Sequence, residues 1–275
     1  MIDREHIKFY ESILNSSSSP IDLSKLDELL YYIIHNKEEE FLNTVLNLID
    51  PNVNKDLLFK VLRLIKEKPE LKDSLFDSFS VNQSASKNAL LDAVNNVVNL
   101  DKESTVFIWG SWYGSILIPK LAPKVKKVVC IDLDNTPLQI AKNRLFNDYK
   151  NVEYICDDVF KSYKNLYLDT NLIINTSCEH MPPMKEWKWF GPGAIKEDIF
   201  KGLKGEGFGS PKLSSECYFV FQSNNMFGIE GHINCVNSIN EFKDQLPERA
   251  KVLYEEEVED TRGTRYMLIG KFMPL

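Results

Sequence analysis

The 275-residue sequence has no apolar run that approaches the ~20 residues needed to cross a bilayer. Its first residues, Met1 to His6, are largely charged and lack the apolar core of a secretory signal peptide. We therefore expect no membrane partner and a cytoplasmic location.

The sequence also lacks an excess of basic residues. The formal net charge is -7, and residues 1–100 contain 11 Lys and Arg against 16 Asp and Glu, which leaves 22 against 24 for the remainder. Proteins that bind a phosphate backbone normally present a basic face. The charge balance therefore disfavours a nucleic-acid partner. The hydrophobic content of 43% and the charged content of 27% are ordinary values and indicate a globular chain.

Closely paired cysteines are absent as well. The five cysteines form no CxxC motif, and Cys130, Cys156 and Cys217 lie in apolar runs. Cysteine in such a run behaves as a small buried hydrophobe. We interpret the set as free thiols of a reduced, intracellular protein.

The first 98 residues carry helical periodicity. Apolar residues recur at three- and four-residue spacing over 26–34, 41–49 and 57–65, and again in a helix expected at 86–99. Pro51 and Pro69 fall between these stretches, where helices end or begin. We predict an all-α domain over residues 1–98 that caps the domain after it.

From residue 104 onward, short apolar runs alternate with helical segments. Such nearly continuous runs are typical of parallel strands buried on both faces. Two longer runs near the end flank the short turn 260–263, which requires an antiparallel hairpin. We expect strands at 104–109, 127–132, 152–156, 171–176 and 217–223, and a hairpin of 251–259 with 264–272. Residues 99–275 are thus predicted to form an α/β domain with a mostly parallel seven-stranded sheet.

Two glycines four residues apart, Gly110 and Gly114, follow the first of these runs, and the second run ends on Asp132. This is the layout of a nucleotide-binding βαβ unit, although the three glycines of the dinucleotide motif are missing. Glycine at the strand end lets the backbone approach a ligand closely. Asp132 is placed to accept hydrogen bonds from a ribose diol.

Four segments in this order resemble class I S-adenosylmethionine-dependent methyltransferases, which have a Rossmann-like sheet. They are Ile108–Gly114, Val129–Asp134, Asn151–Phe160 and Asn171–Met181. The resemblance implies S-adenosylmethionine as cofactor, Asp132 on its ribose and Asp158, rather than Asp157, near its adenine amino group. The cofactor-binding residues implied are Gly110, Ser111, Tyr113, Gly114, Asp132, Leu133, Asp158, Val159, Asn175 and Thr176.

The fourth segment, Asn175-Thr-Ser-Cys-Glu-His-Met181, follows the strand that in this family faces the transferable methyl group. It contains neither the Asn/Asp-Pro-Pro-Tyr/Phe motif of DNA amino-methylating enzymes nor the Pro-Cys nucleophile of cytosine C5 enzymes. Glu179 and His180 are candidates for a general base or a substrate anchor. The alternative is that both only begin a helix.

A second polar cluster, which includes Gln222, Asn224 and His232, follows the fifth strand. Strand ends on one edge of a parallel sheet converge at the ligand crevice. We therefore expect His232 as a third catalytic candidate and Gln222 and Asn224 as substrate-binding residues. Trp187 and Trp189 lie in a long, glycine-hinged connection that has the features of a lid or substrate wall, or else packs on the sheet.

The same clusters offer Cys178, His180, His232 and Cys235 as zinc ligands. Their spacing is not that of a standard zinc module, so we expect no metal from this set.

The leading hypothesis is a methyltransferase that acts on a small molecule, with RNA or protein as less favoured acceptors. The helical domain before the sheet also resembles, in layout, nicotianamine synthase-like enzymes, which transfer the aminocarboxypropyl group of the same cofactor. A third hypothesis is a degenerate domain with a structural or interaction role. This hypothesis is suggested by the bulky side chains of Trp109, Trp112 and Tyr113 in the cofactor loop.

Overall fold

The structure is a computed structural model that describes residues 55–159, 170–186, 217–260 and 262–273. The helices expected at 26–34 and 41–49, and the connection with Trp187 and Trp189, lie outside these residues. Among the helices in the described ranges, none has the length and apolar character that a membrane span requires.

The chain divides into two compact units, Met1–Ala85 and Ser86–Leu275. In the first unit, helix α4 buries Val61, a member of the expected apolar stripe, and Leu64, which that stripe did not include. Pro69 begins the next turn, as the sequence predicts. The domain boundary at residue 98 stays a prediction. The helical elements up to the sheet are α4 (Lys55–Glu67), η2 (Pro69–Leu71), α5 (Lys72–Ser78) and α6 (Val81–Val97).

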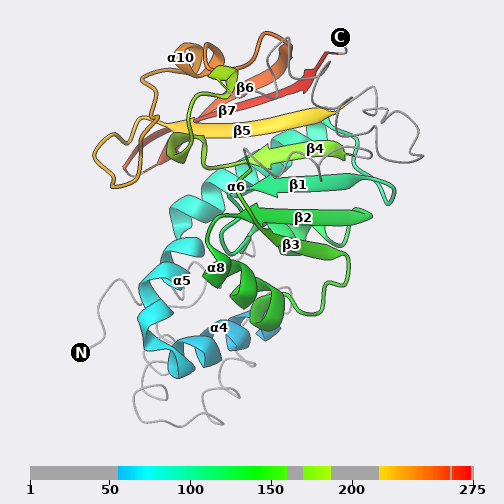
Figure 1. The fold of residues 1–275 in the computed structure, drawn as a ribbon, viewed down its shortest axis with the longest axis vertical. Coiled ribbons are helices and arrows are strands. Elements are labelled where there is room, and N and C mark those ends of the chain that lie inside the picture. Colours follow the sequence, from blue (N-terminus) through cyan, green and yellow to red (C-terminus); the bar gives the residue numbers. More distant parts are fainter. Residues whose placement is uncertain (1–54, 160–169, 187–216, 261, 274–275) are drawn as a thin grey trace, which may run out of the picture. The chain divides into compact units, whose positions relative to one another are not determined.

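The second unit contains a seven-stranded sheet of order β3-β2-β1-β4-β5-β7-β6 (Figure 1). Strands β1 to β5 pair in parallel, and β7 pairs antiparallel with both β5 and β6. The predicted α/β fold is confirmed, and every strand begins and ends within one residue of its predicted bounds. The strands are β1 (Thr105–Trp109), β2 (Lys127–Asp132), β3 (Val152–Cys156), β4 (Thr170–Asn175), β5 (Tyr218–Asn224), β6 (Ala250–Asp260) and β7 (Gly263–Phe272).

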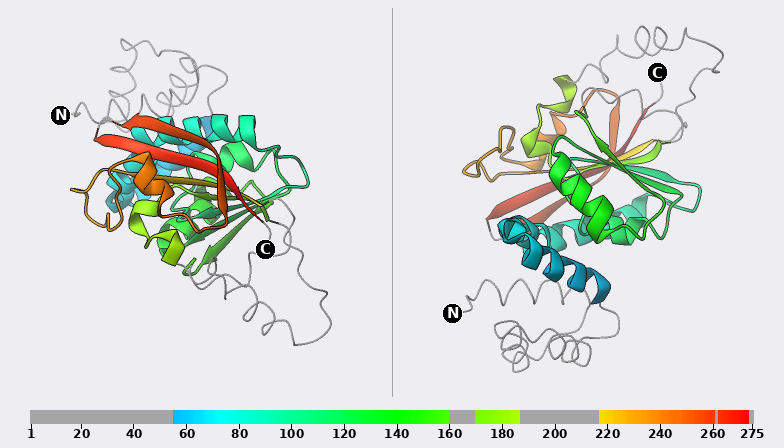
Figure 2. Two further views of the ribbon diagram at one scale, coloured as in Figure 1. Left: turned by 90° about the horizontal axis from the view of Figure 1, so that it is seen from above. Right: turned by 60° about the horizontal axis from the view of Figure 1, so that its bottom comes forward.

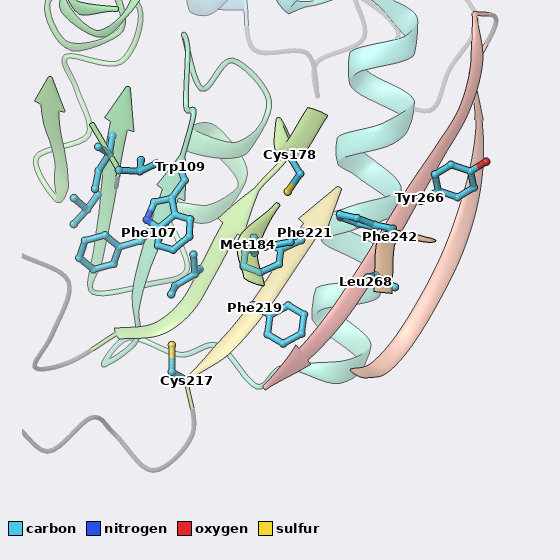
Figure 3. Close-up of a cluster of buried hydrophobic side chains, with 14 of the residues drawn as sticks. Phe107, Trp109, Cys178, Met184, Cys217, Phe219, Phe221, Phe242, Tyr266 and Leu268 are labelled. Atoms are coloured by element: carbon cyan, nitrogen blue, oxygen red, sulfur yellow. The ribbon is translucent and has the colours of Figure 1, made fainter. Parts of the chain in front are cut away.

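Both faces of the central strands are buried, as their apolar runs predict. Alternate residues of a strand point to opposite faces, and one face builds the cluster of Figure 3. In this cluster Trp109 of β1 and Phe219 and Phe221 of β5 lie with Tyr266 and Leu268 of β7, all less than 5% exposed. The cluster extends to α10 (Ile239–Lys243) through Phe242.

Helices cover both sides of this sheet (Figure 2). Phe221 faces α10, whereas the next residue, Gln222, points the other way and accepts a hydrogen bond of 3.0 Å from Ser86 of α6. From Ser86 onward, α6 thus packs on the face opposite α10. The remaining short helical elements are α7 (Leu117–Leu121), α8 (Asn135–Ile140), η3 (Ala141–Leu145), η5 (Cys178–His180) and η6 (Met184–Glu186).

The strand order changes direction between β1 and β4, since β2 and β3 lie on one side of β1 and β5 lies on the far side of β4. Ligands of open α/β sheets bind at the carboxyl ends of the strands beside such a reversal. Strand β7 runs the opposite way, so its first residues lie at this same edge, with Arg265 paired to Asn224. The fold therefore brings the ends of β1 to β5 and the start of β7 together.

One expectation for the cysteines is wrong. Cys130 and Cys217 are buried, and burial raises the pKa of both thiols, that of Cys217 to about 12. Cys156 is exposed instead. Strand β3 forms the edge of the sheet, and an edge strand leaves more of its side chains accessible than a central one.

Candidate active site

The loop after β1 has a left-handed backbone at three positions: Gly110 (φ 59°), Trp112 (φ 49°) and Gly114 (φ 63°). Glycine adopts this conformation freely, whereas for tryptophan it is strained by roughly 1 to 2 kcal/mol. The Trp112 amide donates a 2.7 Å hydrogen bond to Oδ2 of Asp132, which offsets part of that strain. The carboxylate at the end of β2 thus holds the glycine loop in shape.

The two bulky residues of this loop, Trp112 and Tyr113, differ in how far they are buried. Tyr113 is 2% exposed, so its ring is turned into the protein, and Trp112 is half-buried with its ring 5.1 Å from that of Tyr113. Ser111 is buried, and its amide donates to the carbonyl of Ile131. The loop therefore offers backbone and the face of Trp112 at the sheet edge, while Tyr113 serves packing.

Asp132 uses both carboxylate oxygens for backbone contacts, because Oδ1 accepts a 2.9 Å bond from the amide of Asp134. A carboxylate accepts about four hydrogen bonds, so capacity for two hydroxyl donors remains. The following residue, Leu133, is 73% exposed, an unusual position for a large apolar side chain. Asp134 then caps α8 by accepting from the amide of Thr136.

The end of β3 lies directly beside Asp132, whose carbonyl accepts from the amide of Asp157. The Asp157 carboxylate folds back onto the amide of Asp158, at 2.8 Å. Asp158 is half-buried, and Val159 is 5% exposed and belongs to the buried cluster. The local role of Asp157 is consistent with the choice of Asp158 as the ligand-facing acid.

The loop after β4 (residues 176–186, the β4 loop) touches the glycine loop. A Cβ atom on Gly110 would lie 3.2 Å from Met181 Cε and 3.3 Å from Ser177 Cβ, so a side chain there would fill the space between the two loops. Asn175 is fully buried, with its Oδ1 accepting from the amide of Ser177. Its side chain thus shapes the β4 loop, and Thr176 beside it is half-buried.

Glu179 of η5 is the most unusual group at this edge. It is 4% exposed, and its Oε2 has no hydrogen-bond partner among the residues that the structure describes. Burial raises the pKa of this carboxyl, although Arg265 opposes the shift with a guanidinium nitrogen 3.9 Å from Oε1. A buried carboxylate with a free oxygen is suited to accept a proton or to bind a cation.

Arg265 and Asp260 belong to the site although the sequence analysis did not include them. Arg265 is 5% exposed and donates a 3.0 Å hydrogen bond to Oδ2 of Asp260. Burial alone would raise the pKa of Asp260, but hydrogen bonds from Arg262 and Arg265 lower it. The predicted hairpin could have indicated both residues. Its second strand, β7, is antiparallel to β5 and must therefore start where the parallel strands end.

Hydrogen bonds fasten the loop after β5 (residues 225–238, the β5 loop) to Glu179. The carbonyl of Glu179 accepts from the amides of Ile233 and Asn234, both at 2.9 Å. The amide side chains of Asn234 and Gln245 form a reciprocal pair at 2.8 and 2.9 Å. The two loops therefore hold one another in place.

His180 and His232 meet across these loops. Their rings are in edge-to-face contact, with centroids 4.7 Å apart. His180 Nδ1 lies 2.9 Å from the carbonyl of Gly231, and His232 Nδ1 lies 3.0 Å from the carbonyl of Met226. Burial, together with the proximity of His180, lowers the pKa of His232. The three predicted catalytic residues, Glu179, His180 and His232, thus lie together.

The expected substrate residues Gln222 and Asn224 do not join the catalytic candidates at this edge. Gln222 is fully buried, and its amide binds Ser86 on the α6 face, away from the cluster. Asn224 is also fully buried, and its Oδ1 accepts from the amide of Met226, which fixes the start of the β5 loop. Asn224 therefore positions the site rather than lining its open side.

Several solved structures are similar to this chain. The CMeT domain of the citrinin polyketide synthase is 15% identical, with a TM-score of 0.50 over 78% of this chain and 60% of that one. The N-methyltransferase NodS from Bradyrhizobium japonicum WM9, solved with S-adenosyl-L-homocysteine, is 15% identical, with a TM-score of 0.49 over 70% and 88%. M. capricolum TrmK, also solved with S-adenosylhomocysteine, is 12% identical, with a TM-score of 0.42 over 66% and 67%.

No protein-family model matches the chain, and no curated protein is similar to it in sequence. The structural likeness and the strand order agree with the resemblance found in the sequence. The second unit thus has the class I methyltransferase fold.

Proposed function

We propose that the protein is an S-adenosylmethionine-dependent methyltransferase with a small-molecule acceptor. The observation that carries the proposal is the set of residues at the strand ends beside the point where the strand order changes direction. Gly110, Asp132 and Asp158 follow three adjacent parallel strands, in the order that the family resemblance requires. Glu179 follows the fourth strand at the same edge.

The residues at these strand ends fit the cofactor. Asp132 has acceptor capacity for two ribose hydroxyls, and Asp158 offers a carboxylate to the adenine amino group. Leu133, exposed beside them, supplies an apolar surface for the flat face of a base. The space beside Gly110, which a Cβ would fill, leaves the backbone open to the amino-acid part.

Methyl transfer needs a sulfonium methyl and an acceptor held in line, so proximity and orientation are the main contribution of the protein. Where the acceptor carries a proton, Glu179 is placed to remove it, since its Oε2 is buried without a partner among the described residues. The raised pKa of Glu179 makes it a stronger base than an exposed carboxylate. The imidazole of His232, whose pKa is lowered by burial, lies close enough to share this role.

A small acceptor is favoured by charge and by the surface of the β5 loop. The net charge of -7 opposes a phosphate backbone. Two large apolar side chains on the loop that carries His232, Phe227 and Ile233, are 56% and 71% exposed. Exposed apolar side chains beside polar catalytic groups suit an acceptor that combines an apolar part with a reactive heteroatom.

The test is a transfer assay with S-adenosylmethionine labelled in its methyl group and separate small-molecule, RNA and protein fractions of a cell extract as acceptors. Label should appear in the small-molecule fraction, with release of S-adenosylhomocysteine. Label in RNA or protein would contradict the acceptor class. Release of methylthioadenosine would show aminocarboxypropyl transfer and contradict methylation itself.

A further inference from the structure

Three side chains with metal-binding atoms converge between the β4 and β5 loops. A carboxylate oxygen of Glu179 and one nitrogen each from His180 and His232 all lie within 4.8 Å of one another. Donor atoms around a bound Zn²⁺, at about 2.0 to 2.2 Å from it, are roughly 3 to 3.5 Å apart. Shortening of the longest separation by about 1.3 to 1.8 Å therefore brings these groups to coordination distance.

The histidines are oriented as metal ligands usually are. A carbonyl oxygen only accepts hydrogen bonds, so Nδ1 of His180 must donate to Gly231, and Nδ1 of His232 must donate to Met226. In the neutral tautomer that this assignment requires, the lone pair of each ring is on Nε2. A metal-binding histidine typically donates its other ring N–H to a carbonyl or carboxylate, which fixes the tautomer and the orientation.

Glu179 gives an independent indication that this group can hold a cation. Its Oε2 is buried and has no hydrogen-bond partner among the described residues. A guanidinium nitrogen of Arg265 lies 3.9 Å from the other carboxylate oxygen, Oε1, and Arg265 is itself hydrogen-bonded to Asp260. Leaving a carboxylate oxygen buried and unpaired is costly. A cation bound between Glu179 and the two histidines removes that cost.

The cysteines nearby are not part of this group. Cys178 is buried and its Sγ lies 3.8 Å from the carbonyl of Asn175, while Cys235 Sγ lies 3.4 Å from Oδ1 of Asn224. Neither sulfur belongs to the three side chains whose donor atoms lie within 4.8 Å of one another. The group therefore differs from the Cys178, His180, His232 and Cys235 set that the sequence suggested.

We infer that Glu179, His180 and His232 form a binding site for one divalent first-row transition-metal ion. Two imidazoles and one carboxylate favour Zn²⁺, Fe²⁺, Co²⁺ or Mn²⁺ over Mg²⁺ and Ca²⁺, which prefer oxygen ligands. His180 is exposed, so an ion has a path to the site from solvent. Three protein ligands leave positions for water or for an oxygen atom of the acceptor. This use by the acceptor rests on the proposed function, whereas binding of the ion does not.

The experiment uses the full chain, stripped of metal with a chelator and titrated with Co²⁺ followed by visible absorption, and with Zn²⁺ followed by calorimetry. One ion should bind per chain, and a tenfold excess of Mg²⁺ should not displace it. His180→Ala and His232→Ala should each weaken binding by at least about tenfold, a loss typical of damage to a metal site.

Glu230→Gln is the matched control, because it removes an exposed carboxylate from the same loop, next to Gly231. It should bind Co²⁺ as the wild type does. His180 is exposed, so its variant is expected to fold, and thermal melting of each variant checks this. Wild-type protein that binds neither ion, or unchanged binding in His180→Ala, would overturn the inference.

Calorimetry with S-adenosylhomocysteine on the same samples separates the two proposals. Cofactor binding without metal binding overturns only the metal site. Metal binding without cofactor binding overturns only the proposed function.

Discussion

The two sides of this sheet edge, at the ends of β1–β3 and at the ends of β4 and β5, are built in different ways. On the β1–β3 side, contacts join neighbouring strand ends over short sequence distances, as between Trp112 and Asp132, 20 residues apart. On the β4–β5 side they join distant segments: His180 meets Gly231 across 51 residues, and Asn234 meets Cys178 across 56. The first side is a local motif, whereas the second exists only after the chain has folded.

The chemistry differs in the same way. The β1–β3 side presents a carboxylate already supported by two backbone amides, together with open backbone and one exposed leucine. These groups bind and orient. The β4–β5 side holds a buried carboxylate and two imidazoles within 4.8 Å. Such groups can move protons or bind metal, so we propose that the two sides divide binding from reactivity.

The largest effect is expected for Glu179→Gln, which keeps the shape of the side chain but removes its charge. Loss of a general base or a metal ligand should lower methyl transfer by about 100- to 10,000-fold, with little change in S-adenosylhomocysteine affinity. A comparable loss of cofactor affinity would show that the two sides are not separate. Transfer assays and calorimetry on the same preparation decide the point.

Glu179→Gln should also stabilise the metal-free protein at neutral pH. Burial raises the pKa of Glu179 in the folded chain, so the folded state retains a proton that the unfolded state loses. The stabilisation this proton provides is complete below the unfolded pKa and is lost as pH rises through the folded pKa. Thermal melting with chelator present should show this loss in the wild type but not in the variant. Equal pH profiles would contradict the assignment.

Asp132→Ala should weaken S-adenosylhomocysteine binding by about 100-fold, because about two hydrogen bonds from hydroxyls to a charged group are lost. The Trp112 amide also loses its acceptor, so the glycine loop loosens. Asp134→Ala is the matched control two residues away. It removes the cap of α8, which should cost about 1 kcal/mol of stability and leave affinity nearly unchanged. Calorimetry and denaturant unfolding distinguish the two.

Gly110→Ala should weaken cofactor binding by about tenfold and destabilise the protein by about 1 to 2 kcal/mol. Its φ of 59° is unfavourable for alanine, and the new methyl would lie 3.2 Å from Met181 Cε. Gly228→Ala serves as the control, since nothing lies within 4 Å of a Cβ built there. Similar unfolding curves for both variants would contradict the role given to the Gly110 backbone.

The smallest effect is expected for Gln245→Ala on the β4–β5 side. It removes both bonds of the Asn234–Gln245 pair, at about 1 kcal/mol each. The β5 loop and His232 should become less ordered, so Co²⁺ affinity should fall by less than about tenfold, while S-adenosylhomocysteine affinity stays the same. Asn240→Ala, an exposed residue of α10, is the control. A larger loss of cofactor affinity than of Co²⁺ affinity would contradict the division between the two sides.

Most of the fold was predictable, because strand burial and hairpin turns leave local patterns. The runs at β1 to β5 are apolar since both faces of a central strand are covered. Cys156 was expected to be buried but is exposed, because β3 is an edge strand. The sequence does not mark which strand lies at the edge of the sheet.

For the candidate site, the sequence by itself predicted which residues stand at the β1–β3 side. Gly110, Asp132 and Asp158 each stand at the end of a run, and parallel strands end at one edge. Only the tertiary structure decided that Gln222 faces α6 and that Arg265 approaches Glu179. It also decided that His180 and His232 meet beside a buried Glu179 Oε2 that has no partner among the described residues. Side-chain direction and loop docking depend on contacts between distant segments, which a local pattern does not encode.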